Sequence, residues 1–470
     1  MRTGRYFLWG IVISTFAIRL ISLGLYPLMD TTEARYGEMA RIMVQTHNWL
    51  TPQFDYGVPF WGKPPLFAWM SAVGIKLFGL SEFSVRFPHW LAGVAVLGLM
   101  AFFSRRVGVD ALRTAAILAS CGIFVVSAGV VETDMALTLA MTMAMAGFYL
   151  CWSEGKKSWG YLGFVGLAIG LLAKGPLIIV LVGLSVMPWL MLEHGFIGSF
   201  KVLWRRFPVV GGSVLMLAIA LPWYVMAERA TPGFLDYFLV GEYVKRFLDS
   251  GWKGDLYGTA HQHLRGTIWL YWLYAALPWS IILPIVLWVK RRSVRAKQPE
   301  GSRLVSFLLC WMLSPLLLFT LAGNILPAYV LPGIPAVGML MAALLSDSDL
   351  DKKWFKSAAS LVPVLLIGAL VYIHYDVGPV RSDKVIFEHA NNKLPTYYVS
   401  HRTFSGQYYS HGKALQLTSK IDLSALNQFQ LVGEGQQIER LIKHDKLTCE
   451  MKFSAPSHRS LYLCSNTYVS

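Results

Sequence analysis

Long apolar runs, separated by short polar segments, fill the first 374 residues of the chain. A helix needs about 20 mostly apolar residues to cross the hydrocarbon core of a bilayer. The first run follows Arg2 and Arg5 and has no small-residue cleavage site after it, so we interpret it as a retained span and not as a signal peptide. The sequence therefore predicts a polytopic all-α membrane domain over residues 1–374. Its eleven predicted spans lie near residues 6–26, 88–104, 114–131, 135–152, 159–173, 176–192, 207–226, 267–289, 304–322, 326–345 and 357–374.

Clusters of Lys and Arg between the spans predict the orientation of the chain, because cytoplasmic loops carry an excess of positive charge. The rule places the N-terminus in the cytoplasm and three long segments on the opposite side, at 27–87, 227–266 and 375–470. A transporter typically has two matching halves joined by short loops, and we find no internal repeat. This layout is typical of a membrane enzyme that works at the outer surface of the bilayer. The clusters that follow the rule are Arg2/Arg5, Arg105/Arg106/Arg113, Lys156/Lys157, Lys201/Arg205/Arg206 and Lys290/Arg291/Arg292/Arg295/Lys297.

The tail from residue 375 to residue 470 changes to a mixed polar and apolar pattern, which predicts a small α/β domain. Aromatic and β-branched stretches at 397–399, 408–409 and 460–463 favour strands, and the pattern at 437–444 favours a helix.

A hairpin near the C-terminus brings two cysteines together. Strands are expected over 447–454 and 459–466, and Cys449 and Cys464 lie symmetrically about the turn between them. Residues that face each other across such a hairpin have Cβ atoms roughly 4.5–5.5 Å apart. An oxidising outer compartment favours a disulfide between them; two unpaired buried thiols are the alternative.

Composition excludes several classes of protein. Charged residues make up 15% of the chain and apolar residues 55%, with a mean hydropathy of +0.48, whereas soluble domains contain about 25% charged residues. The 42 Lys+Arg against 27 Asp+Glu give a net charge of +15. The positive residues cluster between apolar runs, as in membrane proteins, so we expect no nucleic-acid partner. A soluble enzyme, a disordered chain and a disulfide-rich scaffold are all disfavoured.

The first outer segment carries two acids directly after the first span. Asp30 and Glu33 would lie at the membrane surface, where a carboxylate can serve as a general base toward a hydroxyl. Their spacing also fits a capping box at a helix start, and both interpretations stay open. The residues that follow form an apolar stripe with helical spacing, which predicts an amphipathic helix lying on the bilayer. The stripe consists of Tyr36, Met39, Ala40, Met43 and Val44.

Basic residues next to proline turns are candidate phosphate ligands. Lys63 precedes Pro64 and Pro65 at the start of an apolar helix, where an ammonium group would be held near a helix N-terminus. Lys174, followed by Gly-Pro, interrupts another apolar run on the same face. For Lys63, the alternative is a side chain that extends to the membrane interface. For Lys174, the alternative is an ordinary hairpin turn.

Acids also interrupt the apolar pattern between two later spans. Glu132 and Asp134 lie at a tight outer turn, where carboxylates cost free energy unless they are solvated, paired or bound to a metal. A solvated turn with a helix cap is the alternative.

The second outer segment gathers further charged residues. Glu242 and Arg246 precede His261 and His263, and the His pair is a weak metal signal because its spacing is unusual for ligands on one helix. Tyr329 lies between two prolines at the outer end of a span, where broken helices usually line a cavity. An ordinary solvated loop remains the alternative for the charged residues.

Taken in order over residues 5–345, these motifs resemble the bacterial GT-C glycosyltransferases of the protein-mannosyltransferase superfamily, in particular the branch that transfers aminoarabinose and its shorter relatives. The residues that carry the resemblance are Glu33-Ala34-Arg35-Tyr36, Gly62-Lys63-Pro64-Pro65, Thr133-Asp134, Lys174-Gly175-Pro176, Pro222-Trp223-Tyr224, Glu242 with Arg246-Phe247, Pro278-Trp279 and Leu326-Pro327 with Tyr329 and Leu331-Pro332.

The resemblance implies a GT-C fold that transfers a sugar from a polyprenyl-phosphate donor to a lipid, glycan or protein acceptor. The site and the tail would face the periplasm from the bacterial inner membrane, among membrane lipids, and we expect a monomer. A flippase for lipid-linked sugars and a protein O-mannosyltransferase are the alternatives. The expected catalytic acids are Asp30, Glu33 and Asp134; the expected donor-phosphate ligands are Lys63, Arg246 and Lys174; and the expected substrate-cavity residues are Arg35, Tyr36, Glu242 and Tyr329.

The chain departs from the family pattern at four positions. Thr32 stands where the family often has Asp, and Asn324 replaces a lysine of the aminoarabinose branch. Gly62 stands where an acid is frequent, and Tyr243 where His is frequent. In the family the last two positions fall near a metal site, so no cofactor is certain and a divalent metal is left open.

Overall fold

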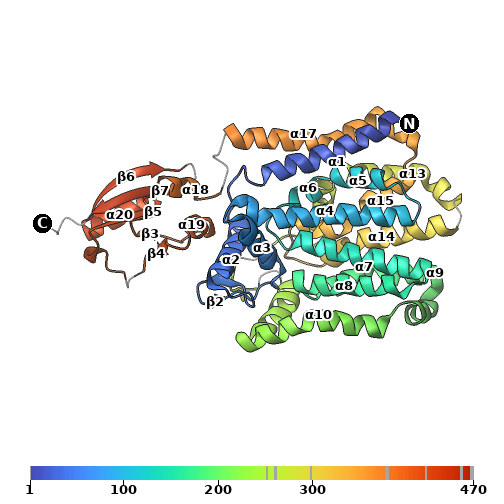
Figure 1. Ribbon diagram of the computed structural model, residues 1–470, viewed down its shortest axis with the longest axis horizontal. Coiled ribbons are helices and arrows are strands. Elements are labelled where there is room, and N and C mark those ends of the chain that lie inside the picture. The colour runs from blue at the N-terminus through green and yellow to red at the C-terminus, as the bar shows by residue number, and fades with distance from the viewer. Residues whose placement is uncertain are drawn as a thin grey trace.

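The computed structural model describes residues 2–249, 252–258, 262–296, 299–375, 381–418, 421–455 and 459–465. A bundle of long helices forms the larger part of the molecule, and a small sheet domain lies beyond one end of it (Figure 1). The first outer segment lies between these two parts.

The bundle is that of a multi-pass membrane protein. Among the described residues, eight helices are long and apolar enough to cross a bilayer, and α12 (Thr267–Ala275) with α13 (Trp279–Ala296), bent by 93°, would add a ninth span. The eight are α1 (Arg2–Ser22), α4 (Glu82–Arg106), α7 (Asp134–Glu154), α9 (Leu177–Arg206), α10 (Val209–Ala230), α14 (Pro299–Thr320), η2 (Pro327–Gly333) continued by α15 (Ile334–Leu344), and α17 (Lys353–Tyr375).

The other two predicted spans have a different form. The run at 159–173 is a single helix, α8 (Lys157–Lys174), whose glycines pack closely on neighbouring helices. The run at 114–131 is broken into α5 (Ala111–Ala119) and α6 (Gly122–Ser127). At the break, the hydroxyl of Ser120 donates to the carbonyls of Ala116 and Ile117, and such back-bonding favours bending of a helix. The total of eleven spans stays a prediction.

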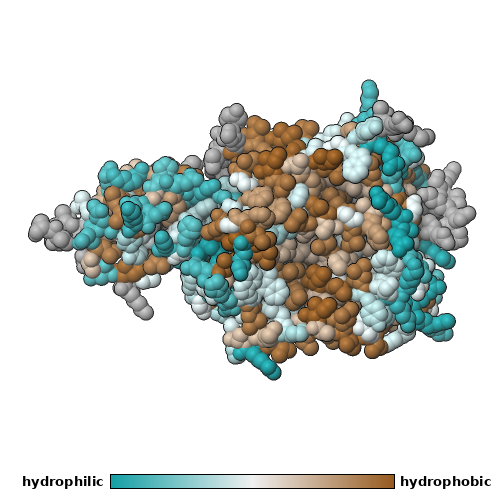
Figure 2. All heavy atoms as spheres, viewed as in Figure 1, coloured by the Kyte–Doolittle hydropathy of each residue, from teal (hydrophilic) through white to brown (hydrophobic). Residues whose placement is uncertain are grey.

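The surface of the bundle divides into zones. Figure 2 shows a hydrophobic zone over the middle of the bundle, with hydrophilic atoms on the sheet domain and along the opposite end. Large apolar side chains such as Trp9, Ile13, Leu217, Ile285 and Leu365 are exposed within the bundle, as expected for helices that face lipid.

The outer segments fold against the end of the bundle. The first contains α2 (Thr32–Thr46), β1 (Gln53–Asp55), β2 (Val58–Pro59) and α3 (Leu66–Phe78), and the second contains the π-helix η1 (Asp236–Lys245) and α11 (Arg246–Leu248). The prediction that α2 lies on the bilayer is wrong in one respect. Its apolar stripe is covered by protein, since Tyr36, Met39 and Met43 are buried in a cluster that includes Phe67 of α3 and Tyr408 of the tail.

The sheet domain has five strands in the order β4-β3-β5-β7-β6. Strand β3 pairs in parallel with β4 and β5, and β7 pairs antiparallel with β5 and β6. The strands are β3 (Thr396–Tyr398), β4 (Leu415–Gln416), β5 (Gln428–Glu434), β6 (Thr448–Ser454) and β7 (Arg459–Ser465). The helices of the tail are α18 (Lys384–His389), α19 (Phe404–Tyr409), η3 (Leu423–Ala425) and α20 (Gly435–Asp445), and α16 (Asp347–Leu350) precedes α17.

Two predictions for the tail have different outcomes. The helix expected at 437–444 is confirmed as α20. The strand expected at 408–409 is wrong, because Tyr408 and Tyr409 end helix α19. That helix starts at a cap in which the Thr403 side chain accepts a hydrogen bond from the Gly406 amide, and Tyr408 packs into the cluster formed by α2 and α3.

The hairpin prediction is confirmed. Strands β6 and β7 pair with Cys449 directly opposite Cys464, and these two cysteines form a disulfide. Residues 456–458 of the expected turn lie outside the described residues.

Candidate functional site

A cavity of about 760 Å³ lies where the outer segments meet the end of the bundle. The first outer segment, the α6–α7 turn, the end of α8, the second outer segment and η2 all contribute to its wall. The tail contributes His401 and Phe404. Eight of the residues predicted from the sequence line this cavity: Arg35, Tyr36, Lys63, Asp134, Lys174, Glu242, Arg246 and Tyr329.

Glu242 joins two of the predicted phosphate ligands. Its carboxylate accepts hydrogen bonds from Lys63 Nζ at 2.8 Å and from Arg246 Nη1 at 3.1 Å. Burial raises the pKa of Glu242, but the neighbouring Lys63 and Arg246 lower it further, so that the net shift is downward. Arg246 also forms an ion pair with Asp255 at 3.3 Å. The group therefore holds two cations at the cavity wall, each with hydrogen-bond donors besides those used here.

Lys174 and Asp134 form a second ion pair in the wall. Lys174 ends α8 and Asp134 begins α7, and their Nζ and Oδ1 atoms are 2.5 Å apart. Both side chains are almost fully buried, and Lys174 Nζ lies 4.3 Å from the centre of the Tyr329 ring. The two residues that interrupted separate apolar runs in the sequence are therefore partners.

Arg35 has no carboxylate partner among the described residues. It donates one hydrogen bond, at 2.7 Å, to the Tyr257 carbonyl, and its Nε is buried without a partner in the described structure. Its guanidinium lies between 5.1 and 5.9 Å from the rings of Tyr36, Phe60 and Phe404. A guanidinium held by aromatic faces, with donors unused, is well suited to an anion in the cavity.

Glu33 does not line this cavity. Its carboxylate accepts hydrogen bonds from Arg86 Nε at 2.8 Å and Nη2 at 2.6 Å. Arg86 is fully buried and also donates to the carbonyls of Leu23, Tyr26 and Pro27. Glu33 thus neutralises an arginine that fixes the chain leaving α1, and the geometry favours a structural role over the catalytic role expected from the sequence.

Asp30 also lies outside the main cavity. Its carboxylate accepts hydrogen bonds from the Ser405 amide at 3.0 Å and from the Ser405 hydroxyl. Burial raises the pKa of Asp30 to about 6. Helix α2 starts at Thr32 after Thr31, whose side chain makes no capping bond, so the capping interpretation is not supported for Asp30. Asp30 instead ties the first outer segment to the tail.

Several wall residues were not among the predicted site residues. Glu132, Asp255 and Tyr257 line the cavity, and among them only Glu132 had a signal in the sequence, as an acid interrupting an apolar run. His401 and Phe404 could not be found from sequence patterns, because nothing in the tail indicates which of its loops faces the bundle.

The residues present do not form an evident metal site. No group of three or more His, Cys, Asp or Glu suited to a metal occurs within the described residues. At the two family positions near a metal, Gly62 has no side chain and Tyr243 packs its ring on Phe238, with centroids 5.1 Å apart. His263 contacts the Tyr271 hydroxyl at 2.9 Å, and His261 lies outside the described residues. We derive no step that passes through a metal.

Comparisons with known proteins found a matching family model and curated relatives. The family model described as dolichyl-phosphate-mannose-protein mannosyltransferase matches residues 5–238. The undecaprenyl phosphate-alpha-4-amino-4-deoxy-L-arabinose arabinosyl transferase of Erwinia tasmaniensis is 30% identical over 336 residues, which are 69% of this chain and 56% of that protein. The protein of the same description from Yersinia pestis (strain Pestoides F) is 30% identical over 384 residues, 78% of this chain and 65% of that one.

The fold has a close counterpart among solved structures. The crystal structure of ArnT from Cupriavidus metallidurans bound to undecaprenyl phosphate superposes with a TM-score of 0.73, at 18% identity, over 96% of this chain and 97% of that chain. The chain spans 56% to 65% of the length of the curated relatives it matches.

Proposed function

We propose that this chain, which belongs to the protein-mannosyltransferase superfamily of GT-C membrane glycosyltransferases, transfers a sugar from a polyprenyl-phosphate carrier to an acceptor of the cell envelope. The curated relatives are named for undecaprenyl phosphate-linked aminoarabinose, and the structural counterpart holds undecaprenyl phosphate. Undecaprenyl phosphate is therefore the carrier we propose, at the periplasmic face of a bacterial inner membrane. We leave the sugar and the acceptor open.

The observation that carries the proposal is the set of cations in the cavity beside the membrane-spanning bundle. When the bond between the sugar and the carrier phosphate breaks, negative charge develops on the phosphate. Fixed positive groups stabilise that charge more in the transition state than in the ground state, and this difference lowers the barrier. Lys63 and Arg246 share Glu242 and line the same cavity as Arg35.

A carrier phosphate would compete with Glu242 for these cations. Lys63 and Arg246 have donors beyond those used by the carboxylate, and both side chains are about one-fifth exposed, at 19% and 21%. Glu242 keeps the two groups in place before the donor arrives, so little reorganisation is needed when the phosphate binds. Lys174, held by Asp134, places a further cation in the wall.

An anionic ligand would pair with Arg35, because the other described cations of the cavity wall already have acidic partners. Within the described lining, four Lys or Arg residues stand beside four carboxylates. Three of the cations are already paired with acids, and Arg35 is not. An incoming phosphate would supply the counter-charge that Arg35 lacks.

The test is deletion of the protein from its host, followed by mass comparison of envelope lipids, glycans and secreted proteins. The proposal predicts that one class of envelope molecule loses a sugar mass and regains it when the wild-type protein is restored. Restoration of that mass by a Lys63→Ala/Arg246→Ala double variant, produced at equal amounts, would count against the phosphate site. Identical masses in all three classes with and without the protein would overturn the proposed function.

A further inference from the structure

A second cavity, of about 390 Å³, lies beside the first and opens between two membrane-spanning helices. Its apolar wall comes from α1 and α17, which lie side by side along one edge of the bundle (Figure 1). Its lining includes Ile18 of α1 and Leu366, Ala369, Leu370 and Ile373 of α17. The window of α17 that is apolar enough to span a bilayer is only 17% buried, so most of the helix that lines this groove would face lipid.

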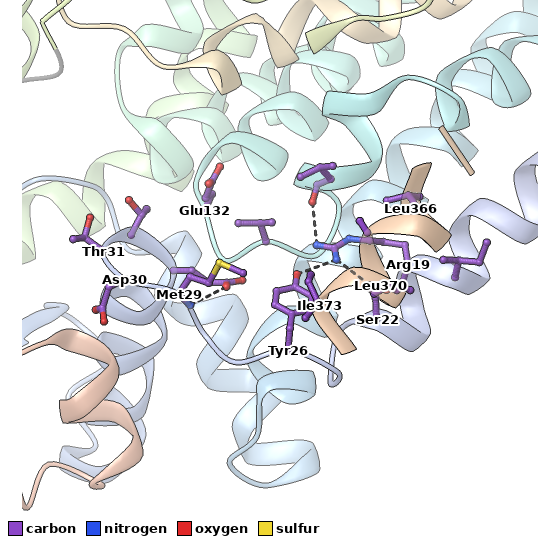
Figure 3. Close-up of a pocket in the computed structure, with 16 residues that line it drawn as sticks. Arg19, Ser22, Tyr26, Met29, Asp30, Thr31, Glu132, Leu366, Leu370 and Ile373 are labelled. Atoms are coloured by element: carbon purple, nitrogen blue, oxygen red, sulfur yellow. Dashed lines mark hydrogen bonds between the residues drawn. The ribbon is translucent and has the colours of Figure 1, made fainter. Parts of the chain in front are cut away.

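Polar and charged side chains also line the groove. Figure 3 shows Arg19 beside Leu366 and Leu370 at one side of the pocket and Glu132 with Asp30 and Thr31 toward the other. The groove therefore combines an apolar wall from membrane-spanning helices with charged groups on both of its sides, as a site for an amphiphile requires.

Arg19 provides positive charge without a counter-ion. It is 5% exposed and forms no ion pair with any described residue. Its donors are used by neutral acceptors: the carbonyls of Ala128 and Val126 at 2.7 and 3.0 Å, and the hydroxyls of Ser22 and Tyr26, both at 2.9 Å. These neutral acceptors lower the cost of burying the guanidinium but leave its net positive charge uncompensated. The groove thus favours a ligand that carries negative charge near its apolar chains.

Glu132 lies where the two cavities meet. It lines both, together with Thr31, Thr32, Val126 and Val130. In the described structure, its carboxylate accepts no hydrogen bond and forms no ion pair. The other acids of the two cavities are all engaged: Asp30 by Ser405, Glu33 by Arg86, Asp134 by Lys174, Glu242 by Lys63 and Arg246, and Asp255 by Arg246.

We propose that the groove between α1 and α17 admits a lipid-anchored, anionic acceptor and that Glu132 takes the proton from the acceptor hydroxyl at the junction of the two cavities. The inference rests on the proposed function and assigns the acceptor side of that site. Lys63 and Arg246 line the main cavity and not the groove. The donor phosphate and the acceptor would thus reach the junction from different cavities, which would allow the acceptor oxygen to attack the anomeric carbon on the side opposite the leaving phosphate, as direct displacement requires.

The proposed step is balanced. The acceptor oxygen forms a bond to the anomeric carbon while its proton moves to the Glu132 carboxylate. The bond from that carbon to the phosphate oxygen breaks, and its electron pair stays on the carrier phosphate, beside Lys63 and Arg246. Burial, and then the neighbouring Asp134, raise the pKa of Glu132 to about 8, which suits a base that must accept a proton near neutral pH.

The groove is tested by filling it. Ala369→Trp places a large side chain in the lining, and Ile367→Trp is the matched control, because Ile367 is 50% exposed and is not in the lining. Each variant is produced in the deletion host, where the lost sugar mass reports transfer, and each purified protein is tested for binding of undecaprenyl phosphate. We expect Ala369→Trp to reduce transfer at least tenfold with unchanged undecaprenyl phosphate binding, and Ile367→Trp to match the wild type.

Two results would overturn the groove assignment without touching the proposed function. Transfer by Ala369→Trp at the wild-type rate would mean that the acceptor does not use the groove. Loss of undecaprenyl phosphate binding in Ala369→Trp would mean that the groove holds the donor chain.

Glu132 is tested by Glu132→Gln with Glu132→Asp as the conservative variant. We expect Glu132→Gln to lower transfer by at least a hundredfold while undecaprenyl phosphate still binds, and Glu132→Asp to recover part of the rate. Transfer by Glu132→Gln at the wild-type rate would show that Glu132 does not act as the base. Loss of transfer together with loss of donor binding would also contradict the role, because a base for the acceptor should not affect the donor.

Discussion

Glu33 and Arg86 lie together in a buried ion pair, and this pairing changes the expected effect of a substitution at Glu33. Removing one partner of a buried pair costs about 3–5 kcal/mol, because the other charge is left uncompensated. We expect Glu33→Gln to lower the melting temperature of the purified protein. Glu388→Gln is the control, since Glu388 is 55% exposed and its nearest ion-pair contact is 4.0 Å long. If transfer were abolished while the melting temperature stayed unchanged, Glu33 would have a catalytic role and not a structural one.

Lys63 and Arg246 are expected to act on donor affinity. A charge-assisted hydrogen bond is worth about 1.5–3 kcal/mol net, and 1.4 kcal/mol corresponds to about tenfold in affinity. Lys63→Ala or Arg246→Ala should therefore weaken undecaprenyl phosphate binding by roughly ten- to hundredfold. Lys76→Ala is the matched control, because Lys76 lies on α3 outside both cavities. Equal affinities in all three variants would contradict the phosphate site.

Sequence patterns could find the charged residues of the site but not their partners. Glu33 and Arg86 are 53 residues apart, and Asp30 and Ser405 are 375 apart. No local pattern relates residues at such separations, so the sequence could not tell a paired acid from a free one. Glu132 could be recognised in the sequence because it interrupts an apolar run. That it has no partner in the described structure could not be predicted, because this depends on Lys174 pairing with Asp134 in the fold.

At the scale of elements, apolar periodicity predicted most helices well and failed where local bonds compete with it. The break between α5 and α6 falls at Ser120, whose hydroxyl bonds back to the preceding turn. Tyr408 and Tyr409 favour a strand by composition, but a cap at Thr403 and packing against α2 make them helical. By contrast, the β6–β7 hairpin was predictable because its two strands are neighbours in the chain.

The disulfide in that hairpin has a measurable consequence. A crosslink stabilises mainly by restricting the unfolded chain, typically by about 2–4 kcal/mol. We expect Cys449→Ser/Cys464→Ser to unfold the tail at a lower temperature, with Cys310→Ser as the control because Cys310 is a free thiol. In protein purified without reductant, a thiol reagent should leave Cys449 and Cys464 unlabelled. Labelling of both would contradict the disulfide.

At the scale of the whole molecule, the tail must lie on the same side of the membrane as the cavity. His401 and Phe404 line the cavity, and the Lys and Arg clusters predict that this side is outside. We expect reporter fusions at Ser158 and Ser293 to give cytoplasmic signals and a fusion at Ser470, which lies outside the described residues, to give an outside signal. A cytoplasmic signal at Ser470 would contradict the orientation.

The most direct measurement follows the donor itself in detergent, where there is no membrane across which a flippase could move it. Lipid extract from the deletion host, which should contain the unused lipid-linked sugar and the acceptor, is mixed with purified protein and followed by mass spectrometry. We expect free undecaprenyl phosphate and the sugar-bearing acceptor to appear together in equal amounts. They should form with the wild type and much more slowly with the Lys63→Ala/Arg246→Ala double variant. A lipid-linked sugar that stays intact with folded wild-type protein would contradict the proposed transfer.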